Sequence, residues 1–205
     1  MKTKQQFLRW LMLLTLVLSA LGAWAQTSQT PTQNVCVGSE PYIVDKPLGI
    51  SGSTYTWTIS GGGTITSGNG SNSINVNWTT PGGPYDLSVI RNDGNCDGPP
   101  QTVRVTVNPL PVITLTGASP VCLNSTGNVY TTEASMTNYV WTVVGGTITT
   151  GGTATSNTAT VTWDGTGPYS VSVNYDNANG CKAASAKVLP VTINPLPATT
   201  PIFHN

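Results

Sequence analysis

The feature that most constrains this sequence is an internal repeat. Five short motifs occur twice in the same order, and the offset between the copies stays between 83 and 86 residues. The pairs are Tyr55–Ile59 with Tyr139–Val143, Gly62–Thr66 with Gly145–Thr149, Ile74–Trp78 with Ala159–Trp163, Gly83–Tyr85 with Gly167–Tyr169, and Asn108–Pro111 with Asn194–Pro197. A repeat of this length is one structural unit used twice. The predicted domains are residues 26–110 and 111–197, followed by a tail at 198–205.

Each unit is predicted to be all-β. Hydrophobic and polar residues alternate with a period of two in short segments, which is typical of a strand with one buried face. The segments are Tyr55–Ile59, Ile74–Trp78, Tyr85–Val89 and Val103–Val107, and then Tyr169–Val173 and Val191–Ile193. Turn residues separate them, and glycines such as those at 61–63 and 145–146 fit tight turns. We expect a two-sheet β-sandwich, with a closed barrel as the alternative.

Six aromatic residues lie in phase with the apolar faces of these strands and are expected to form the structural core. They are Trp57, Trp78, Tyr85, Trp141, Trp163 and Tyr169. Exposed aromatic residues would instead be platforms on which sugar rings stack. Tyr42, Tyr130 and Tyr175 have no assigned place in the strands and are the candidates for that second role.

The first 25 residues are predicted to be a secretory signal peptide. They begin with basic residues, continue with an apolar run over Leu11–Leu21, and end in the small-x-small site Ala23–Ala25. No other long apolar segment follows, so we expect no membrane span after the leader is removed. The expected location is extracellular, either secreted or at the cell surface.

Charge excludes some classes of partner. The leader holds three of the eight basic residues and none of the eight acidic ones, so the mature chain is acidic by three charges. A mildly acidic chain without a basic cluster is not expected to bind nucleic acid or anionic membranes. Only 8% of all residues are charged, and Thr, Ser, Asn and Gly therefore supply the polar surface.

The four cysteines allow three pairings. Cys36 and Cys122 open the two units, whereas Cys96 and Cys181 follow the Tyr85 and Tyr169 strands. Equivalent bonds in equivalent units require Cys36–Cys96 and Cys122–Cys181, and an oxidising compartment permits them. Each bond would close a loop of about 60 residues and contribute about 4 kcal/mol in the chain-entropy model. A zinc site is disfavoured because there is no Cys-x-x-Cys spacing and no nearby histidine.

The sequence offers little for catalysis, and we expect no enzyme and no cofactor. The single histidine, His204, is next to the C-terminal residue, and no pair of carboxylates is shared by the two units. Calcium is the one metal considered, because Asp93 and Asp97 lie in one short loop and Asp176 and Asn179 in another. Asp and Asn are also ordinary turn residues, so these are weak calcium candidates.

Taken together, these motifs resemble the PKD-like (polycystic-kidney-disease-type) repeats of bacterial surface proteins. The resemblance rests on the leading cysteine, Tyr-x-Trp, Gly-Gly-Thr-Ile, Gly-Pro-Tyr and Asn-Pro-Leu-Pro, each present in both units. It implies an immunoglobulin-like β-sandwich and a spacer or adhesive role. It implies no catalytic residues. The acidic turn that often follows Tyr-x-Trp in this family is replaced here by glycines, which removes any ligand role tied to it.

Two functions from different classes follow. The first is a non-catalytic structural or adhesive module, a tandem spacer whose proline-rich joint stiffens the hinge between units. The alternative is a carbohydrate-binding module. Neither reading names the protein or glycan partner, and neither says whether the chain is anchored.

Overall fold

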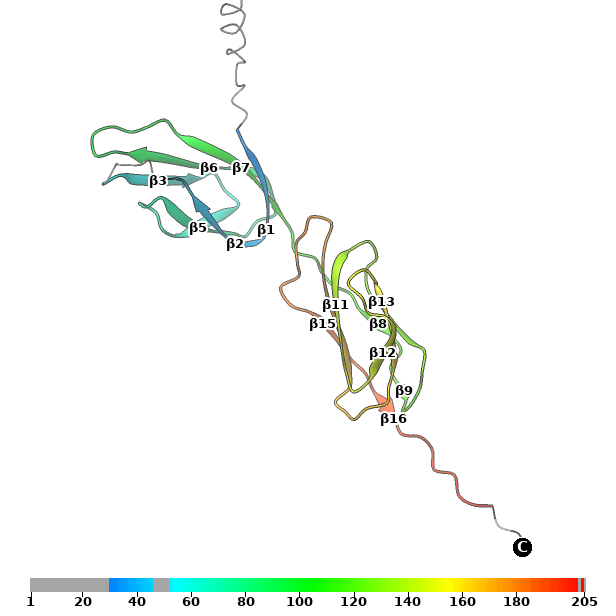
Figure 1. Cartoon of the computed structure of the whole chain (residues 1–205). Coiled ribbons are helices and arrows are strands. Elements are labelled where there is room, and N and C mark those ends of the chain that lie inside the picture. The colour runs from blue at the N-terminus through cyan, green and yellow to red at the C-terminus, as the bar shows by residue number, and fades with distance from the viewer. Residues whose placement is uncertain (1–29, 46–51, 203, 205) are drawn as a thin grey trace, which may run out of the picture. The chain divides into compact units, whose positions relative to one another are not determined.

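The computed structural model describes residues 30–45, 52–202 and 204 (Figure 1). The predicted signal peptide lies outside these residues. The described part of the chain is built from strands and turns, so the prediction of an all-β fold is confirmed. Within these ranges, no helix is long and apolar enough to cross a membrane.

The first repeat is a sandwich of two sheets (Figure 1). One sheet has four strands in the order β1-β7-β6-β3, and the other has three in the order β2-β5-β4. The strands are β1 (Thr32–Cys36), β2 (Gly38–Ile43), β3 (Thr54–Ile59), β4 (Gly63–Ser67), β5 (Ser73–Trp78), β6 (Gly82–Asn92) and β7 (Gln101–Asn108). β1 pairs with β7 in parallel, and the other neighbours are antiparallel.

The second repeat has the same plan with a divided first strand. β12-β13-β10-β8 form one sheet, β11-β14-β15 form the facing sheet, and β16 pairs with β9 in parallel. The strands are β8 (Thr116–Gly117), β9 (Val121–Cys122), β10 (Asn128–Thr131), β11 (Thr137–Val144), β12 (Thr147–Gly151), β13 (Thr158–Thr162), β14 (Ser170–Asp176), β15 (Lys187–Pro190) and β16 (Ile193–Asn194). The parallel pair β9–β16 is the counterpart of β1–β7.

The last strand of the second repeat differs from its prediction. A continuous strand was expected over Val191–Ile193, but the strand begins earlier and is interrupted there. Pro190 ends β15, and proline has no N–H to donate to a ladder. The next two amides bond elsewhere: Val191 N donates to Tyr169 O at 3.0 Å, and Thr192 N to Ser119 Oγ at 3.0 Å.

Each sandwich has its own hydrophobic core. Trp78 and Trp163 occupy equivalent positions at the two centres, and both are fully buried. Tyr85 stacks on Trp78 with ring centroids 6.1 Å apart, and Tyr169 meets Trp163 edge-on at 5.9 Å. Two separate cores mean that the stability of each repeat comes from burial within that repeat.

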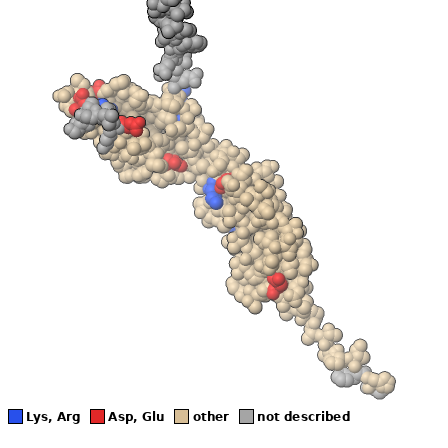
Figure 2. All heavy atoms as spheres, viewed as in Figure 1, with Lys and Arg blue, Asp and Glu red and all other residues tan. Residues whose placement is uncertain are grey.

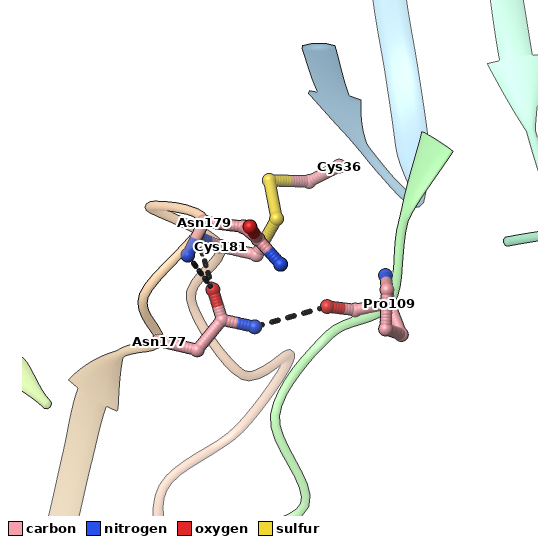
Figure 3. Close-up of a disulfide and its surroundings, with 5 residues drawn as sticks. All are labelled: Cys36, Pro109, Asn177, Asn179 and Cys181. Atoms are coloured by element: carbon pink, nitrogen blue, oxygen red, sulfur yellow. Dashed lines mark hydrogen bonds between the residues drawn. A yellow bond between two sulfur atoms is a disulfide. The ribbon is translucent and has the colours of Figure 1, made fainter. Parts of the chain in front are cut away.

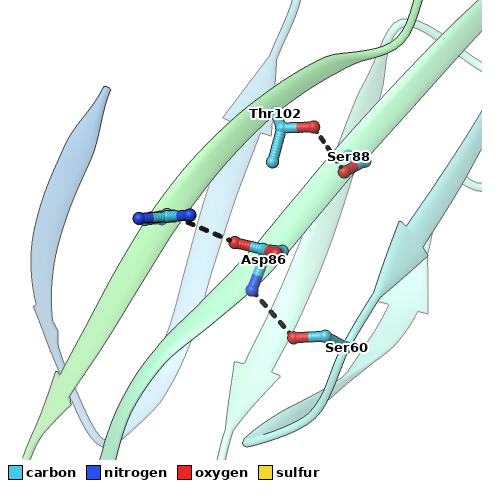
Figure 4. A network of polar contacts seen from close by, with 5 residues as sticks. Ser60, Asp86, Ser88 and Thr102 are labelled. Carbon is cyan, nitrogen blue, oxygen red and sulfur yellow. Dashed lines mark hydrogen bonds and ion pairs between the residues drawn. The ribbon is translucent and has the colours of Figure 1, made fainter. Parts of the chain in front are cut away.

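The outward faces of the sheets carry hydroxyl groups and few charges. In β6 and β7, Ser88 and Thr102 hydroxyls lie 2.7 Å apart, and Asp86 makes an ion pair with Arg104 at 3.6 Å (Figure 4). The Asp86 amide also donates to the Ser60 hydroxyl at 2.8 Å. Figure 2 shows charged residues only as isolated spots on the visible face. The hydroxyl-rich, weakly charged surface predicted from composition is the one that the strands present.

Candidate functional site

A disulfide bond links the two repeats. Cys36, the last residue of β1, is bonded to Cys181, in the loop that follows β14 (Figure 3). The two Cα atoms are 5.6 Å apart, and the cysteines are 145 residues apart in sequence. Cys181 is fully buried, whereas the remaining cysteines, Cys96 and Cys122, are exposed thiols.

The pairing predicted from the sequence, Cys36–Cys96 and Cys122–Cys181, is therefore wrong. The reason is the parallel pairing of β1 with β7, which places Cys36 opposite Asn108, the last residue of β7. Cys96 lies before Gln101, the first residue of β7. Eight residues of strand hold the two ends about 23 Å apart, whereas a disulfide needs Cα atoms within about 7 Å. The second repeat has the same geometry, since Cys122 pairs with Asn194.

Asn177 fixes the loop that carries Cys181. Its Oδ1 accepts hydrogen bonds from the amides of Asn179 and Cys181, both at 3.0 Å, and its backbone N donates to Cys181 O at 2.9 Å. The Asn177 Nδ2 donates to the carbonyl of Pro109 at 3.1 Å (Figure 3). Pro109 belongs to the Asn-Pro-Leu-Pro joint, so one side chain both shapes the loop and contacts the joint beside the disulfide.

The corresponding loop of the first repeat is held in the same way. Asp93 Oδ1 accepts from the amides of Asn95 and Cys96, each at 2.9 Å, and Asn92 Nδ2 donates to Asp97 Oδ1 at 2.8 Å. Hydrogen bonds from the backbone amides of Cys96 and then Asn95 lower the pKa of the Asp93 carboxyl. Carboxylate and amide oxygens are therefore engaged within the loop, as in an ordinary Asx turn.

The structure does not strengthen the case for calcium. Asp93 and Asp97 are in one repeat and Asp176 and Asn179 in the other, and Asp176 Oδ2 accepts from Asn138 Nδ2 at 2.7 Å. Among the described residues, no three or more His, Cys, Asp or Glu side chains are grouped as a metal site would require. His204 is exposed near the C-terminus.

The aromatic residues lie inside the sandwiches. All four of the core tryptophans are buried, and Trp57 and Trp141 make equivalent hydrogen bonds from Nε1 to the carbonyls of Ser71 and Ser156, both at 2.9 Å. Tyr85 and Tyr169 are half-buried and pack against the cores.

Two of the three tyrosines considered for sugar stacking are buried in the core of the second repeat. Tyr130 and Tyr175 are 0% and 1% exposed, and Tyr42 accepts a hydrogen bond from Trp78 Nε1 at 3.1 Å. The rings of Tyr130 and Tyr175 are enclosed and cannot stack on a sugar, whereas Tyr42 is half-buried and packs edge-on against Trp78. The glycan-binding alternative thus loses two of the three tyrosines on which it depended.

Sequence reasoning missed a polar cluster around Glu133. Its Oε1 accepts from the amide of Thr114 at 2.8 Å and from the hydroxyl of the same residue, and its Oε2 accepts from Thr132 Oγ1 and Tyr175 OH, both at 2.7 Å. Burial acts to raise the pKa of this half-buried carboxyl, but the hydrogen bonds from Thr114, Thr132 and Tyr175 outweigh it and lower the pKa to about 2. Burial, followed by the bond to Glu133, raises the pKa of Tyr175.

The topology defines a class of protein, namely tandem immunoglobulin-like β-sandwich modules. The sequence matches the PKD-like domain at residues 24–107 and again at 108–191. The chain therefore belongs to the PKD-like domain family, and it carries two copies of the domain. No catalytic domain is detected, and a search of curated proteins finds no match.

Solved structures with a similar fold are distant. The fibronectin(III)-like modules of Clostridium thermocellum CbhA are 14% identical with a TM-score of 0.40, and the alignment covers 87% of this chain and 98% of that one. Bacteroides ovatus SGBP-B, solved with a mixed-linkage heptasaccharide, is 19% identical with a TM-score of 0.30, and the alignment covers 82% of this chain and 44% of that one. Protocadherin Gamma B2 cadherin domains 3–6 are 14% identical with a TM-score of 0.34, and the alignment covers 87% of this chain and 49% of that one. At these values the likenesses carry no functional argument, and the chain spans about half of the last two.

Proposed function

We propose that this chain is a non-catalytic extracellular module, a tandem spacer that makes structural or adhesive contacts with protein at a cell surface. The observation that carries the proposal is the location of the aromatic side chains. The strands place them in the cores and present Thr, Ser and Asn outward, with little charge. Such a surface suits a connecting module, because the large apolar side chains that it exposes over the described residues are aliphatic.

The joint between the repeats supports the same role. A spacer transmits position from one module to the next, which requires a constrained connection. Pro109 and Pro111 restrict the backbone of the joint, and the Cys36–Cys181 bond adds a second covalent link between the repeats. The export that this role requires is also what allows the disulfide to form and persist.

A cell-binding experiment tests the adhesive part. The full chain is secreted through its own leader, labelled, and added to cells of the organism that produces it. Cells are first treated with protease, with periodate to oxidise glycans, or with buffer. We expect saturable binding that is lost after protease and kept after periodate. The opposite pattern would favour the carbohydrate-binding alternative, and no binding to untreated cells would contradict adhesion to that surface.

A further inference from the structure

The two exposed cysteines occupy the same positions in their repeats as the two bonded ones. Cys36 pairs with Asn108 in the parallel β1–β7 ladder, and Cys122 pairs with Asn194 in the parallel β9–β16 ladder. The next amide donates to that asparagine's carbonyl in both repeats: Val37 N to Asn108 O at 3.0 Å, and Leu123 N to Asn194 O at 2.9 Å. Cys122 is thus placed in the second repeat as Cys36 is placed in the first.

Cys96 and Cys181 are equivalent in the same way. Cys96 lies in the loop between β6 and β7, and Cys181 lies in the corresponding loop between β14 and β15. The amide of each donates to an Asx side chain, Asp93 Oδ1 at 2.9 Å and Asn177 Oδ1 at 3.0 Å. The backbone also closes each loop alike, since Asp93 N donates to Cys96 O at 3.3 Å and Asn177 N to Cys181 O at 2.9 Å.

The observed bond therefore has a direction. It joins the strand-end cysteine of one repeat to the loop cysteine of the repeat that follows. By the same rule, the partner expected for Cys122 is a loop cysteine of a following repeat, and the partner expected for Cys96 is a strand-end cysteine of a preceding repeat. The geometry excludes a bond between the strand-end cysteine and the loop cysteine of the same sandwich, as shown for Cys36 and Cys96.

We propose that copies of this chain join head to tail through a disulfide between Cys122 of one copy and Cys96 of the next. A second copy is the partner because it carries the complementary half of the joint. The contact is heterologous, using different surfaces on the two partners, so its repeated use generates linear chains or closed rings of copies. The proposal stands apart from the cell-binding role, since it concerns the purified chain alone.

Both thiols are accessible for such a bond. Cys96 and Cys122 are exposed. Cys96 also lines a hollow of about 300 Å³ together with Arg91, Asp97 and Gly98, which leaves room beside the sulfur for the strand end of a second copy. The bonded cysteine at the equivalent loop position, Cys181, is fully buried.

The chemistry is a two-electron oxidation of two thiols by a disulfide oxidant such as oxidised glutathione. The thiolate of one cysteine attacks the oxidant and forms a mixed disulfide, releasing one glutathione thiolate. The thiolate of the partner cysteine then attacks the mixed disulfide and releases the second. Two Sγ–H groups lose their protons, one Sγ–Sγ bond forms, and one oxidised glutathione becomes two reduced ones.

Asp93 is expected to make the joint between two copies weaker than the joint between the two repeats of one chain. Asn177 donates its side-chain N–H to Pro109 O at 3.1 Å. The equivalent residues in a joint between copies are Asp93 and Pro195, and a carboxylate has no hydrogen to donate to a carbonyl. Asp93→Asn supplies the missing donor and keeps the Oδ1 that accepts from Cys96.

The test uses two full-length variants, Cys96→Ser and Cys122→Ser, secreted with the Cys36–Cys181 bond formed. Each is incubated in a glutathione redox buffer, separately and as an equimolar mixture, and products are resolved on non-reducing gels with disulfide mapping by mass spectrometry. We expect wild type to form a ladder of multiples, either variant alone to stay monomeric, and the mixture to form a dimer through Cys122–Cys96 at about tenfold or more over either variant alone.

The remaining outcomes are also decisive. A roughly 1:2:1 mixture of the three possible dimers would mean random thiol coupling and would overturn the proposal. So would a monomeric mixture, or a Cys96–Cys122 bond within one wild-type chain. Asp93→Asn, added to the Cys122→Ser variant, should speed formation of the mixed dimer about two- to tenfold. An unchanged rate would show that this loop does not meet Pro195 as Asn177 meets Pro109.

Discussion

The turn between β11 and β12 requires a glycine at position 145. Gly145 has a φ of +78°, and a Cβ atom there would lie 2.5 Å from the ring of Tyr169 and 2.9 Å from the carbonyl of Pro168. Gly62 has the equivalent place in the first repeat, with a φ of +77° and the ring of Tyr85 beside it. The Gly-Pro-Tyr and Gly-Gly motifs therefore recur together because the tyrosine ring packs directly on the turn.

We expect Gly145→Ala to destabilise the second sandwich by about 2–4 kcal/mol. A left-handed backbone is unfavourable for alanine, and the new methyl group must also displace the Tyr169 ring. Urea denaturation followed by tryptophan emission measures the change. Gly127→Ala is the matched control, since Gly127 has a φ of +72° with no atom within 4 Å of the added carbon. Its cost should be about 1 kcal/mol, and equal losses would refute the role of the ring.

Glu133 makes the second sandwich sensitive to acid. Its pKa is lowered from 4.5 to about 2 in the folded chain. The stability that this carboxylate contributes is complete above pH 4.5 and is lost as the pH falls toward 2, because the unfolded chain takes up the proton first.

Glu133→Gln should lower the free energy of unfolding at pH 7 by about 1–3 kcal/mol. Solvent around the half-buried carboxylate keeps the loss toward the lower end. The amide must also turn N–H groups toward donors such as Tyr175 OH. In thermal melts between pH 7 and 2.5, the melting temperature of this variant should fall less with decreasing pH than that of wild type. Asp164→Asn changes an exposed carboxylate and is the control, so its melting temperature should follow that of wild type at each pH. Parallel pH profiles for all three chains would contradict the assignment of the acid sensitivity to Glu133.

At the scale of the strand, the inward and outward faces of β11 differ in which substitutions they tolerate. Trp141 is 9% exposed and bonded to Ser156 O, whereas its neighbour Thr142 is exposed. The same alternation occurs in β3 with Trp57 and Thr56. Strands of this kind are specified by which residues point inward, and the outward positions are free to vary.

We expect Trp141→Ala to destabilise the second repeat by about 3–5 kcal/mol, because it leaves a cavity and an unpaired Ser156 carbonyl. Thr142→Val should stay within about 0.5 kcal/mol of wild type, since the added methyl group remains in solvent. Chemical denaturation of the two variants gives both values. A large loss in Thr142→Val would mean that this face is covered.

The strands that the sequence predicted are those with the clearest alternation. β3, β5, β6, β7 and β14 carry in-phase Trp, Tyr, Val or Ile, so period two is plain. β2 was missed because it contains Gly, Ser and Pro, which are typical turn residues, and β10 was missed because it has only four residues. Their tyrosines, Tyr42 and Tyr130, consequently had no place in a predicted strand and were considered as sugar-stacking candidates.

The disulfide and the Glu133 cluster could not be read from the sequence for a different reason. Repeat equivalence identified matching cysteines, but it did not say that β1 runs parallel to β7 and holds Cys36 at the far end from Cys96. Glu133 is surrounded by Thr114, Thr132 and Tyr175, which only the folded sandwich brings together. Both features depend on long-range pairing, which local pattern does not encode.

For the whole molecule, the two cores and the one bond between repeats make distinct contributions. Each core lies within one repeat, so each sandwich has what it needs to fold. The Cys36–Cys181 bond restricts the unfolded chain over a separation of 145 residues. It is therefore expected to stabilise the folded chain against unfolding without being needed to form either sandwich.

Cys36→Ser should keep the far-ultraviolet spectrum and tryptophan emission of wild type while lowering resistance to denaturant. The chain-entropy model gives about 5 kcal/mol as the upper limit of the loss. Cys122→Ser is the matched control, because Cys122 is exposed and unbonded, and it should change stability by less than about 0.5 kcal/mol. Collapse of the native spectra in Cys36→Ser would show that the sandwiches depend on the bond.

The same bond also decides where mechanical tension travels. A pull applied at the two ends of the chain reaches Cys36, crosses the sulfur atoms to Cys181, and continues toward the C-terminus. All of the first sandwich after β1, and the second as far as β14, is then shielded from load. After reduction, unfolding of both sandwiches under load would add a separation of 145 residues, or about 500 Å of extended chain. The bond thus limits how far the pair of repeats can be stretched under oxidising conditions.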